Sequence, residues 1–465
     1  MDRRRDFMRD SDTIAAIATP VAAAGLGVVR LSGSDAITVA DRVFRSAGGK
    51  RLSDLAGYTA LYGHVVDADG DIDDCVALVF RAPHSYTGEN TVELSCHGGV
   101  YLLQRVLRAV LDAGARAAEA GEFTRRAFVN GKMDLAGAEA VMTLIAANGR
   151  LAAKTALAAR EGAIYRRLEQ VKQSLLAVTA QFSAFVDYPD DDIPELDAAV
   201  LEPVLQQARD TLTALLATYD AGRVLREGID TVIVGSPNVG KSTLMNALAG
   251  CERSIVTDVA GTTRDIVEET VRVGEVMLRL SDTAGIRDTA DEVESIGVTR
   301  ARARLAQAAL VLAVFDGSRP LTAADRAVAE QAATQTAIAV VNKTDSGTLS
   351  EDDKSYIEFI FQHIVYISAQ NGDGLAALAA CVEQVTGVAH LQDNEPVLVT
   401  ERQRACARRC LDCVEEALSA LIGGMTLDAV SVSIDGALAA VLELTGERTT
   451  EAVVEEIFSR FCVGK

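Results

Sequence analysis

The sequence lacks any apolar run that approaches the roughly 18 residues needed to span a bilayer. The longest candidate covers only residues 308–315. The first residues, 1–6, include three arginines but have no apolar segment behind them, so they do not form a secretory signal. These absences predict a cytoplasmic protein without membrane association.

Positive charge and cysteine are also scarce. Lys and Arg number 45 against 66 Asp and Glu, which gives a formal net charge of −21. Such an acidic surface repels nucleic acid, so nucleic-acid binding requires a local basic patch or a partner protein. The eight cysteines are scattered along the chain, which argues against a disulfide framework and for reduced thiols.

At 465 residues the chain is too long for a single core, and its character changes along its length. Residues 1–130 combine short apolar runs with a helical pattern over residues 101–111, which predicts an α/β or α+β domain. Residues 131–222 and 386–465 have apolar residues at helical spacing, whereas residues 223–385 alternate strand and helix patterns. We therefore predict one helical domain into which a complete nucleotide-binding unit is inserted.

The inserted unit is expected to contain a mostly parallel sheet with helices on both faces, because strands and helices alternate in it. The polar segment 222–228 is expected to be the linker that leads into it. A hairpin pattern at residues 273–275 predicts one antiparallel edge strand. The expected strands cover residues 231–234, 266–273, 276–280, 310–315, 337–341 and 363–367.

Residues 231–243 carry the clearest chemical signal. A β-branched apolar run ends in Gly235-Ser-Pro-Asn-Val-Gly240-Lys241-Ser242 and continues into a helical pattern, as in the GxxxxGK(S/T) phosphate-binding loop. The glycines allow backbone N–H groups to surround a polyphosphate, Lys241 reaches the terminal oxygens, and Ser242 offers a hydroxyl to Mg²⁺. A chance glycine turn is a poor alternative, because further motifs follow in the required order.

Three such motifs follow predicted strands. Asp282-Thr-Ala-Gly285 places a carboxylate where it can hold a Mg²⁺ water and a glycine N–H where it can face a γ-phosphate. In Asn342-Lys-Thr-Asp345 a carboxylate can accept hydrogen bonds from N1–H and the amino group of guanine, and Ser368-Ala369 completes the base pocket. In this order, at the carboxyl ends of strands, the motifs predict a guanine-nucleotide site.

The segment between the loop and Asp282 contains Gly261-Thr-Thr-Arg-Asp265, where a threonine can complete the Mg²⁺ shell; the alternative is a polar hairpin entry. Ile286 follows the switch motif at the position where signalling GTPases carry a water-orienting glutamine. Another group must therefore position the attacking water. The nearby acidic residues are candidates, although such a run is also typical of a solvated helix start: Asp288, Asp291, Glu292 and Glu294.

Segments outside the inserted unit extend the pattern over nearly the whole chain. They are residues 29–33, 86–94, 97–99 and 121–135 and the terminal Phe461-Cys-Val-Gly-Lys465. With these segments the chain resembles the translation-factor-related bacterial GTPases and, among them, the MnmE (TrmE) family of tRNA-modifying GTPases. The resemblance implies an α/β and all-α multidomain fold: a folate-binding and dimerising α+β N-terminal domain (1–130), a discontinuous helical domain (131–222 and 386–465) with a cysteine-containing tail, and an inserted Ras-like G domain (223–385).

The resemblance also implies an activity. Members of the family are K⁺-stimulated GTP hydrolases that act as homodimers with the flavoprotein MnmG. The two proteins together add an aminomethyl or carboxymethylaminomethyl group to carbon 5 of the wobble uridine of certain tRNAs. The implied cofactors are Mg²⁺, K⁺ and a reduced folate, either 5-formyl- or 5,10-methylene-tetrahydrofolate, with FAD and NADH supplied through the partner.

Carried onto this sequence, the resemblance assigns Lys241, Glu294 and Cys462 to catalysis, with Glu294 acting on the attacking water through a bridging water. It assigns Mg²⁺ to Ser242 and Thr263, and K⁺ to Asn238, Thr257, Val259 and Thr262. The GTP-binding residues are Asn238, Val239, Gly240, Lys241, Ser242, Thr243, Thr257, Asp258, Val259, Ala260, Gly261, Thr262, Thr263, Asp282, Thr283, Ala284, Gly285, Asn342, Lys343, Asp345, Ser368, Ala369 and Gln370. The folate-binding residues are Arg30, Glu93, Lys132 and Lys465.

The folate assignment is chemically reasonable, because a pterin offers an amide and amino edge to a carboxylate and a glutamate tail suits cations. Without the family, Arg30 and Glu93 are typical of charges at a strand edge. For Cys462 the alternative to a catalytic thiol is that it only positions Lys465.

Two features depart from the simplest pattern. Gln370 stands where a basic residue often follows Ser368-Ala369, which affects a base-stacking contact but not guanine binding. Cys406, Cys410 and Cys413 have the spacing of iron–sulfur ligands, but the same spacing marks one apolar face of a helix. We expect the helix, because the stretch has no glycine or proline.

Two other functions stay open on the residues alone. A ribosome-assembly GTPase would share the nucleotide motifs but would need a basic RNA-binding module, for which only the short clusters at residues 300–304 and 402–409 are present. A non-enzymatic GTP-dependent scaffold would use dimerisation of the G domains only to move the helical arms. The sequence does not specify the tRNAs or the folate form.

Overall fold

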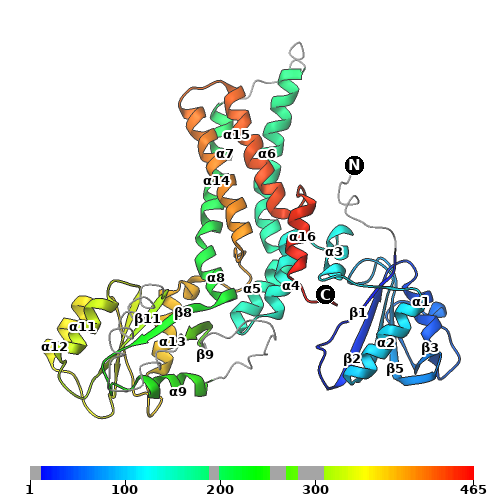
Figure 1. The fold of residues 1–465 in the computed structure, drawn as a ribbon. Helices are drawn as coiled ribbons and strands as arrows, with labels where there is room; N and C mark the ends of the chain where they lie inside the picture. The colour runs from blue at the N-terminus through cyan, green and yellow to red at the C-terminus, as the bar shows by residue number, and fades with distance from the viewer. Residues whose placement is uncertain (1–11, 188–197, 252–268, 281–307, 465) are drawn as a thin grey trace, which may run out of the picture. The chain divides into compact units, whose positions relative to one another are not determined.

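The computed structural model describes residues 12–187, 198–251, 269–280 and 308–464 (Figure 1). It divides into two compact units. The first comprises Met1–Met142, Ala159–Ala208 and Arg409–Lys465, and the second comprises Thr143–Ala158 and Arg209–Arg408. Among the described residues, no helix combines the length and the apolar character that a membrane crossing requires. The predicted domain boundaries stay a prediction.

The first unit begins with a seven-stranded sheet in the order β3-β4-β5-β6-β2-β1-β7. Its pairs are antiparallel except β1 with β7, so this part of the chain is α+β. Helices α1 and α2 contribute to one apolar core with alternate residues of the central strands. The elements are β1 (Ile14–Ile17), β2 (Ala24–Ser32), α1 (Ala36–Val43), β3 (Phe44–Ser46), η2 (Leu52–Asp54), β4 (Thr59–Asp67), β5 (Gly70–Phe80), β6 (Thr91–Gly98), α2 (Val100–Asp112), β7 (Arg116–Ala117) and α3 (Glu122–Val129).

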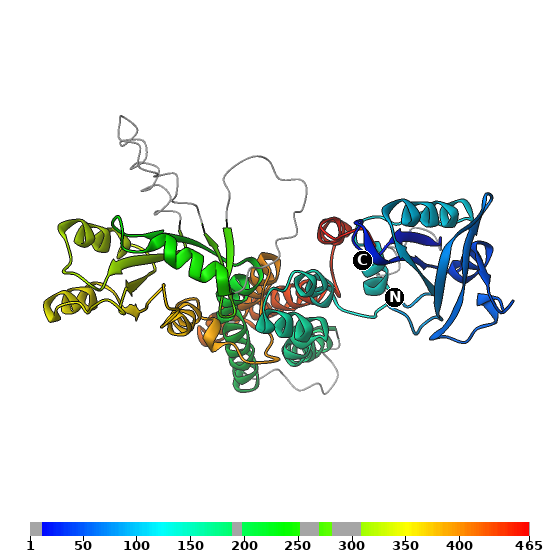
Figure 2. The same cartoon turned by 90° about the horizontal axis from the view of Figure 1, so that it is seen from below.

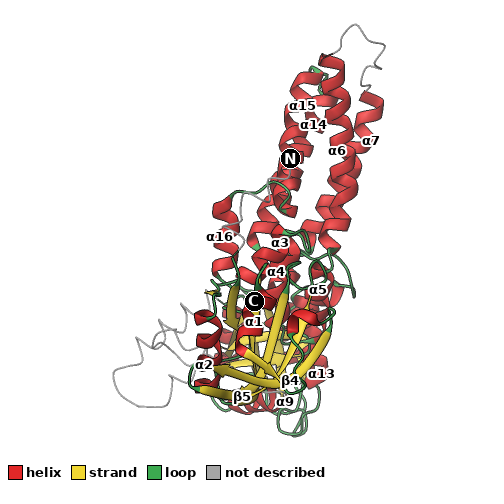
Figure 3. Cartoon of the chain, turned by 90° about the vertical axis from the view of Figure 1, so that its right-hand side faces the viewer, coloured by secondary structure: helices red, strands yellow, loops and turns green. Residues whose placement is uncertain are grey.

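Helices make up most of the remainder of that unit, as the apolar spacing predicts. Figure 3 shows α6 and α15 as long helices that run side by side, and they pack against each other. The predicted helix with three cysteines is present as α14, and no cluster of three or more His, Cys, Asp or Glu residues suited to a metal ion occurs in the described ranges. The further helices that lie wholly in this unit are α6 (Ala163–Asp187), α15 (Leu427–Thr445) and α16 (Glu451–Ser459). Helices α4 (Leu135–Ile145), α7 (Ala198–Ala217) and α14 (Glu401–Ile422) continue into the second unit, which also contains most of α5 (Arg150–Arg160).

The second unit contains a six-stranded sheet in the order β13-β12-β11-β8-β10-β9. Figures 1 and 2 show strands of this sheet in green and yellow, with helices beside them. Only β9 pairs antiparallel, with β10, so the predicted parallel sheet and its antiparallel edge are confirmed. The elements are β8 (Ile229–Val234), α9 (Lys241–Cys251), β9 (Glu269–Val273), β10 (Val276–Leu280), β11 (Leu310–Asp316), α11 (Ala323–Ala332), β12 (Ala337–Asn342), α12 (Glu351–Ile360), β13 (His363–Tyr366), α13 (Leu375–Val385) and η3 (Val388–His390).

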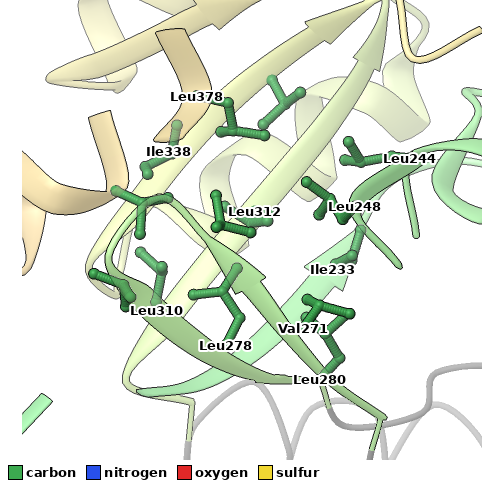
Figure 4. Packing of buried hydrophobic residues seen from close by; sticks show 14 of the residues in the cluster. Ile233, Leu244, Leu248, Val271, Leu278, Leu280, Leu310, Leu312, Ile338 and Leu378 are labelled. Atoms are coloured by element: carbon green, nitrogen blue, oxygen red, sulfur yellow. The ribbon is translucent and has the colours of Figure 1, made fainter. Parts of the chain in front are cut away.

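Both faces of this sheet are covered by helices. Leu310 and Leu312 of β11 point into a core that α9 and α13 complete (Figure 4). Val311 and Phe315 of the same strand point into a second core with α11 and α12. A central strand that is buried on both sides explains its continuous apolar sequence.

The predicted linker at residues 222–228 is wrong. The chain there forms helix α8 (Tyr219–Glu227), and Ala221 and Leu225 of this helix are buried. A Cβ atom at Gly222 would lie 2.2 Å from the Leu398 carbonyl oxygen, so this glycine permits close packing rather than a flexible connection.

Candidate nucleotide-binding site

The phosphate-binding loop connects the carboxyl end of β8 to the N-terminus of α9, inside the parallel sheet. Two glycines make its path feasible. A Cβ atom at Gly235 would lie 2.5 Å from the Val314 carbonyl oxygen, and one at Gly240, where φ is 97°, would lie 2.3 Å from Asn342 Nδ2. The loop therefore packs directly against the strands β11 and β12 that follow it in the sheet.

Lys241 is the cation of this loop. Its Nζ donates hydrogen bonds to the carbonyl oxygens of Gly235 at 2.7 Å and Ser236 at 2.9 Å. Burial lowers the pKa of Lys241 below its ordinary value. Ser242 and Thr243 are exposed beside it at the start of α9. An ammonium group and a helix N-terminus at one loop suit a polyphosphate.

Asn342 joins the phosphate-binding loop to the loop on the other side of the site. Its side chain is only 2% exposed. Nδ2 donates to the Val239 carbonyl oxygen at 3.0 Å, and Oδ1 accepts from the Ala369 backbone N–H at 3.0 Å. One buried amide therefore fixes the relative positions of residues 239 and 369.

Lys343 makes a second connection from the same motif. Its Nζ donates to the Asn238 carbonyl oxygen at 2.6 Å and to Asp316 Oδ2 at 2.7 Å. Burial acts to raise the pKa of the Asp316 carboxyl, but hydrogen bonds from Lys343 and Ser318 outweigh burial and hold that pKa below its ordinary value. Asp316 was not among the site residues predicted from the sequence. Its signal was a carboxylate directly after the apolar run of β11.

Asp345 lies on the side expected for the base. It accepts hydrogen bonds from Ser368 Oγ at 2.6 Å and from Ser346 Oγ at 2.8 Å. These two hydroxyls lower the pKa of the Asp345 carboxyl, which is therefore ionised at neutral pH. The carboxylate is exposed and oriented, as recognition of a guanine edge requires, and Gln370 is exposed next to Ala369.

Several predicted residues lie outside the described ranges. They are Thr257, Asp258, Val259, Ala260, Gly261, Thr262, Thr263, Asp282, Thr283, Ala284, Gly285, Glu294 and Lys465. Strand β10 ends at Leu280, just before the Asp282 motif, which agrees with the predicted place of that motif after a strand.

A separate cluster in the first unit contains two of the predicted folate residues. Arg30 of β2 and Glu93 of β6 are direct cross-strand neighbours, and Arg30 Nε donates to Glu93 Oε1 at 2.8 Å. The guanidinium lies over the rings of Tyr86 and Phe123, at 5.8 and 5.7 Å from their centroids. The Arg30 side chain is only 16% exposed, so it is not a solvated surface charge.

The C-terminal tail reaches the same cluster. Arg30 Nη1 donates to the Gly464 carbonyl oxygen at 3.3 Å, and Val463 bridges to Ala120. Cys462, one residue earlier, is exposed. Lys132 is exposed and donates through Nζ to the Pro83 carbonyl oxygen at 3.1 Å. The structure therefore joins Arg30, Glu93 and the tail by direct contacts, whereas Lys132 follows α3 and contacts, through Pro83, the loop that also carries Tyr86.

A phosphate-binding loop, a buried asparagine joint and an oriented aspartate at the carboxyl ends of parallel strands define the chain as a GTPase of the P-loop class. A model of the MnmE helical domain matches residues 135–462, and a model of the GTP-binding protein TrmE N-terminus matches residues 13–132. The chain belongs to the MnmE family of tRNA modification GTPases.

Curated relatives agree along the whole chain. The tRNA modification GTPase MnmE of Alkaliphilus metalliredigens (strain QYMF) is 40% identical over 458 residues, which cover 98% of this chain and 99% of the relative. The protein of the same name from Geobacillus kaustophilus (strain HTA426) is 39% identical over 462 residues, 98% of this chain and 100% of the relative. That of Symbiobacterium thermophilum is 42% identical over 459 residues, 98% and 99% of the two chains. The predictions of the family, of a GTP-hydrolysing enzyme and of a multidomain layout are confirmed.

Proposed function

We propose that this chain is a K⁺-stimulated GTPase that modifies the wobble uridine of certain tRNAs at carbon 5, as a homodimer with the flavoprotein MnmG. The group added is aminomethyl or carboxymethylaminomethyl, and GTP is hydrolysed to GDP and phosphate. One observation supports the proposal most directly. The Asn342 side chain hydrogen-bonds both to the phosphate-binding loop and to the loop whose Ser368 donates to Asp345.

In this proposal each part of the nucleotide has its own partner. Lys241 and the N–H groups at the start of α9 bind the phosphates, and Asp345 accepts hydrogen bonds from guanine. Ser242 and Thr263 supply the hydroxyl oxygens that Mg²⁺ prefers, and the bound ion would neutralise charge on the β- and γ-phosphates. Glu294 orients the attacking water, because Ile286 has no polar atom to do so.

The potassium ion of this proposal belongs at Asn238, with Thr257, Val259 and Thr262 as further oxygen donors. The Asn238 side chain is exposed on the phosphate-binding loop, where its carbonyl oxygen can serve as a ligand for a cation. A monovalent cation there would offset the charge that develops during hydrolysis, in place of an arginine finger.

The reduced folate belongs in the first unit, at the cluster around Arg30. Glu93 offers a carboxylate for the amino edge of a pterin, and Tyr86 and Phe123 offer aromatic rings beside it. Lys132 and Lys465 are the cations for the glutamate tail. The exposed thiol of Cys462 is the candidate for catalysis in this region, and FAD and NADH come with the partner protein.

A homodimer through the first unit is supported by an apolar patch on its sheet. Tyr62 of β4 and Val76 of β5 are direct cross-strand partners, and they are 55% and 44% exposed. Contiguous exposed apolar groups on a sheet are typical of an interaction surface. The cytoplasmic location expected from the sequence stays a prediction.

Nucleoside analysis of tRNA tests this function. Cells that lack the gene should lose the modified wobble uridine, and the unaltered gene should restore it, whereas a gene encoding Lys241→Ala should not. Purified protein should turn over GTP many times, which a non-enzymatic scaffold would not do. Unchanged modified nucleosides in the deletion strain would refute the proposed function.

A further inference from the structure

Asp316 is a buried carboxylate that touches the nucleotide site only through another residue. It ends β11 beside Asn342 of β12 and is 6% exposed. Its oxygens have separate partners: Oδ1 accepts from the Ser318 backbone N–H at 3.0 Å and from Ser318 Oγ at 2.6 Å, and Oδ2 accepts from Lys343 Nζ at 2.7 Å. Three hydrogen bonds leave this carboxylate little freedom to rotate.

Lys343 connects this fixed carboxylate to the phosphate-binding loop. Its ammonium bridges Asp316 and the carbonyl oxygen of Asn238, which lies 2.6 Å from Nζ. An ammonium with a fixed anion on one side is held in place for the acceptor on its other side. If Asp316 lost its charge, the lysine would be free to turn toward solvent, because Lys343 is only partly buried.

The backbone at both ends of this hydrogen bond is unusual. Among the residues that the structure describes, four that are not glycine have φ in the left-handed region, namely Tyr58, Asn238, Lys343 and Asn394. Asn238 (φ 65°) and Lys343 (φ 64°) are two of the four, and the bond joins them. Side chains disfavour this conformation, and functional sites maintain it through surrounding contacts.

We propose that Asp316 is a positioning residue of the GTPase site: through the Lys343 ammonium it holds Asn238 in the left-handed conformation and so directs the Asn238 side chain toward the bound potassium ion. This inference rests on the proposed K⁺ site. It predicts that the K⁺ requirement of hydrolysis depends on a carboxylate that contacts neither the nucleotide nor the ion.

The test compares matched variants of the full-length protein. GTP hydrolysis is measured against K⁺ concentration at constant ionic strength, with Na⁺ as the balancing ion. Asp316→Asn should raise the half-saturating K⁺ concentration about tenfold, because a charge-assisted hydrogen bond becomes a neutral one, and leave turnover at saturating K⁺ within about twofold. Ser318→Ala keeps the carboxylate but removes one of its hydrogen-bond donors. This variant should also raise the half-saturating K⁺ concentration, but by less than Asp316→Asn.

Asp353→Asn is the matched control. Asp353 is also a buried carboxylate of this sheet domain, 5% exposed and paired with Arg326 at 2.8 Å. It lies in the first turn of α12, where it accepts a hydrogen bond from the N-cap residue Ser350 at 2.9 Å, and it does not contact the nucleotide-site residues described above. Its substitution should lower thermal stability without changing the K⁺ titration. Equal K⁺ titrations for Asp316→Asn, Asp353→Asn and the unaltered protein would overturn the inference.

Release of fluorescent N-methylanthraniloyl-GDP gives a second readout that does not depend on K⁺. If the unaltered protein hydrolyses GTP equally in K⁺ and Na⁺, the proposed K⁺ site fails, and nucleotide release then decides the role of Asp316. Faster release from Asp316→Asn than from Asp353→Asn would support positioning of Lys343. Equal release rates would overturn it.

Discussion

Asn342→Ala should destabilise the second unit and weaken nucleotide binding together. The substitution removes a donor and an acceptor, which leaves the Val239 carbonyl and the Ala369 N–H without their partner. Both residues are buried, at 0% and 5% exposure. Each buried polar group that loses its partner costs about 1–3 kcal/mol, so we expect a loss of about 3 kcal/mol in the free energy of unfolding. For a domain of this size, that corresponds to a fall of roughly 6–12 °C in Tm.

The assay is thermal unfolding of the full chain, with and without GDP, combined with titration of fluorescent GDP. Because Asn342 fixes the phosphate-binding loop relative to the base-side loop, the Kd for GDP should rise by about tenfold to a hundredfold, which is the same scale of free energy. Asn371→Ala is the control, since Asn371 is exposed two residues beyond Ala369. A Tm within about a degree of the unaltered protein would refute the claim that the Asn342 side chain stabilises the contact between residues 239 and 369. A lower Tm with unchanged GDP affinity would mean that Asn342 contributes to the stability of the fold but not to nucleotide binding.

Four further predictions concern the nucleotide and folate sites. Asp345→Asn should shift preference from GTP to xanthosine triphosphate, whose 2-oxo group accepts from an amide; unchanged GTP affinity would contradict guanine recognition by Asp345. Asn238→Ala should flatten the K⁺ response, and equal turnover of the unaltered protein in K⁺ and Na⁺ would count against the K⁺ site. Glu294→Ala should leave GTP binding nearly intact and lower kcat roughly 10²-fold, and unchanged turnover would mean that the water is held elsewhere. Arg30→Ala should abolish reduced-folate binding in calorimetry on the full chain, whereas binding equal to that of the unaltered protein would remove Arg30 from the site.

The sheet of the second unit was predictable because its strands obey local rules. The apolar runs that became β11 and β12 are continuous, as strands buried on two faces must be, and each is followed at once by a polar residue at the carboxyl end. The hairpin of β9 and β10 was visible from a glycine, Gly274, which has φ of 64°. Local backbone requirements and burial patterns therefore carry most of this architecture.

Helix α8 was not predictable by the same rules, because its glycine has a tertiary cause. Gly222 and Gly228 bound a short polar segment, which is typical of a linker. In the structure Gly228 ends the helix with φ of 74°, as a terminal glycine does, whereas Gly222 is inside it. What selects glycine at 222 is the carbonyl of Leu398, 176 positions further along the chain, and no local pattern contains that contact.

The cluster around Arg30 also depends on contacts between distant parts of the chain. The family motifs pointed to Arg30 and to the end of the chain separately, but only the fold explains why they belong together. The Arg30 guanidinium donates to the carbonyl of Gly464, 434 positions away. Gly464 itself has φ of 99°, and a Cβ atom there would lie 2.4 Å from the Ile17 carbonyl oxygen. The tail can therefore approach the first sheet closely only because its penultimate residue has no side chain.

Phe461 anchors the approach, since it is buried against Phe458 with ring centroids 5.2 Å apart. The sequence leaves two roles open for Cys462, a catalytic thiol and a residue that only positions Lys465. The buried Phe461 before it and the docked Gly464 after it fix the backbone on both sides of the exposed Cys462, as either role requires.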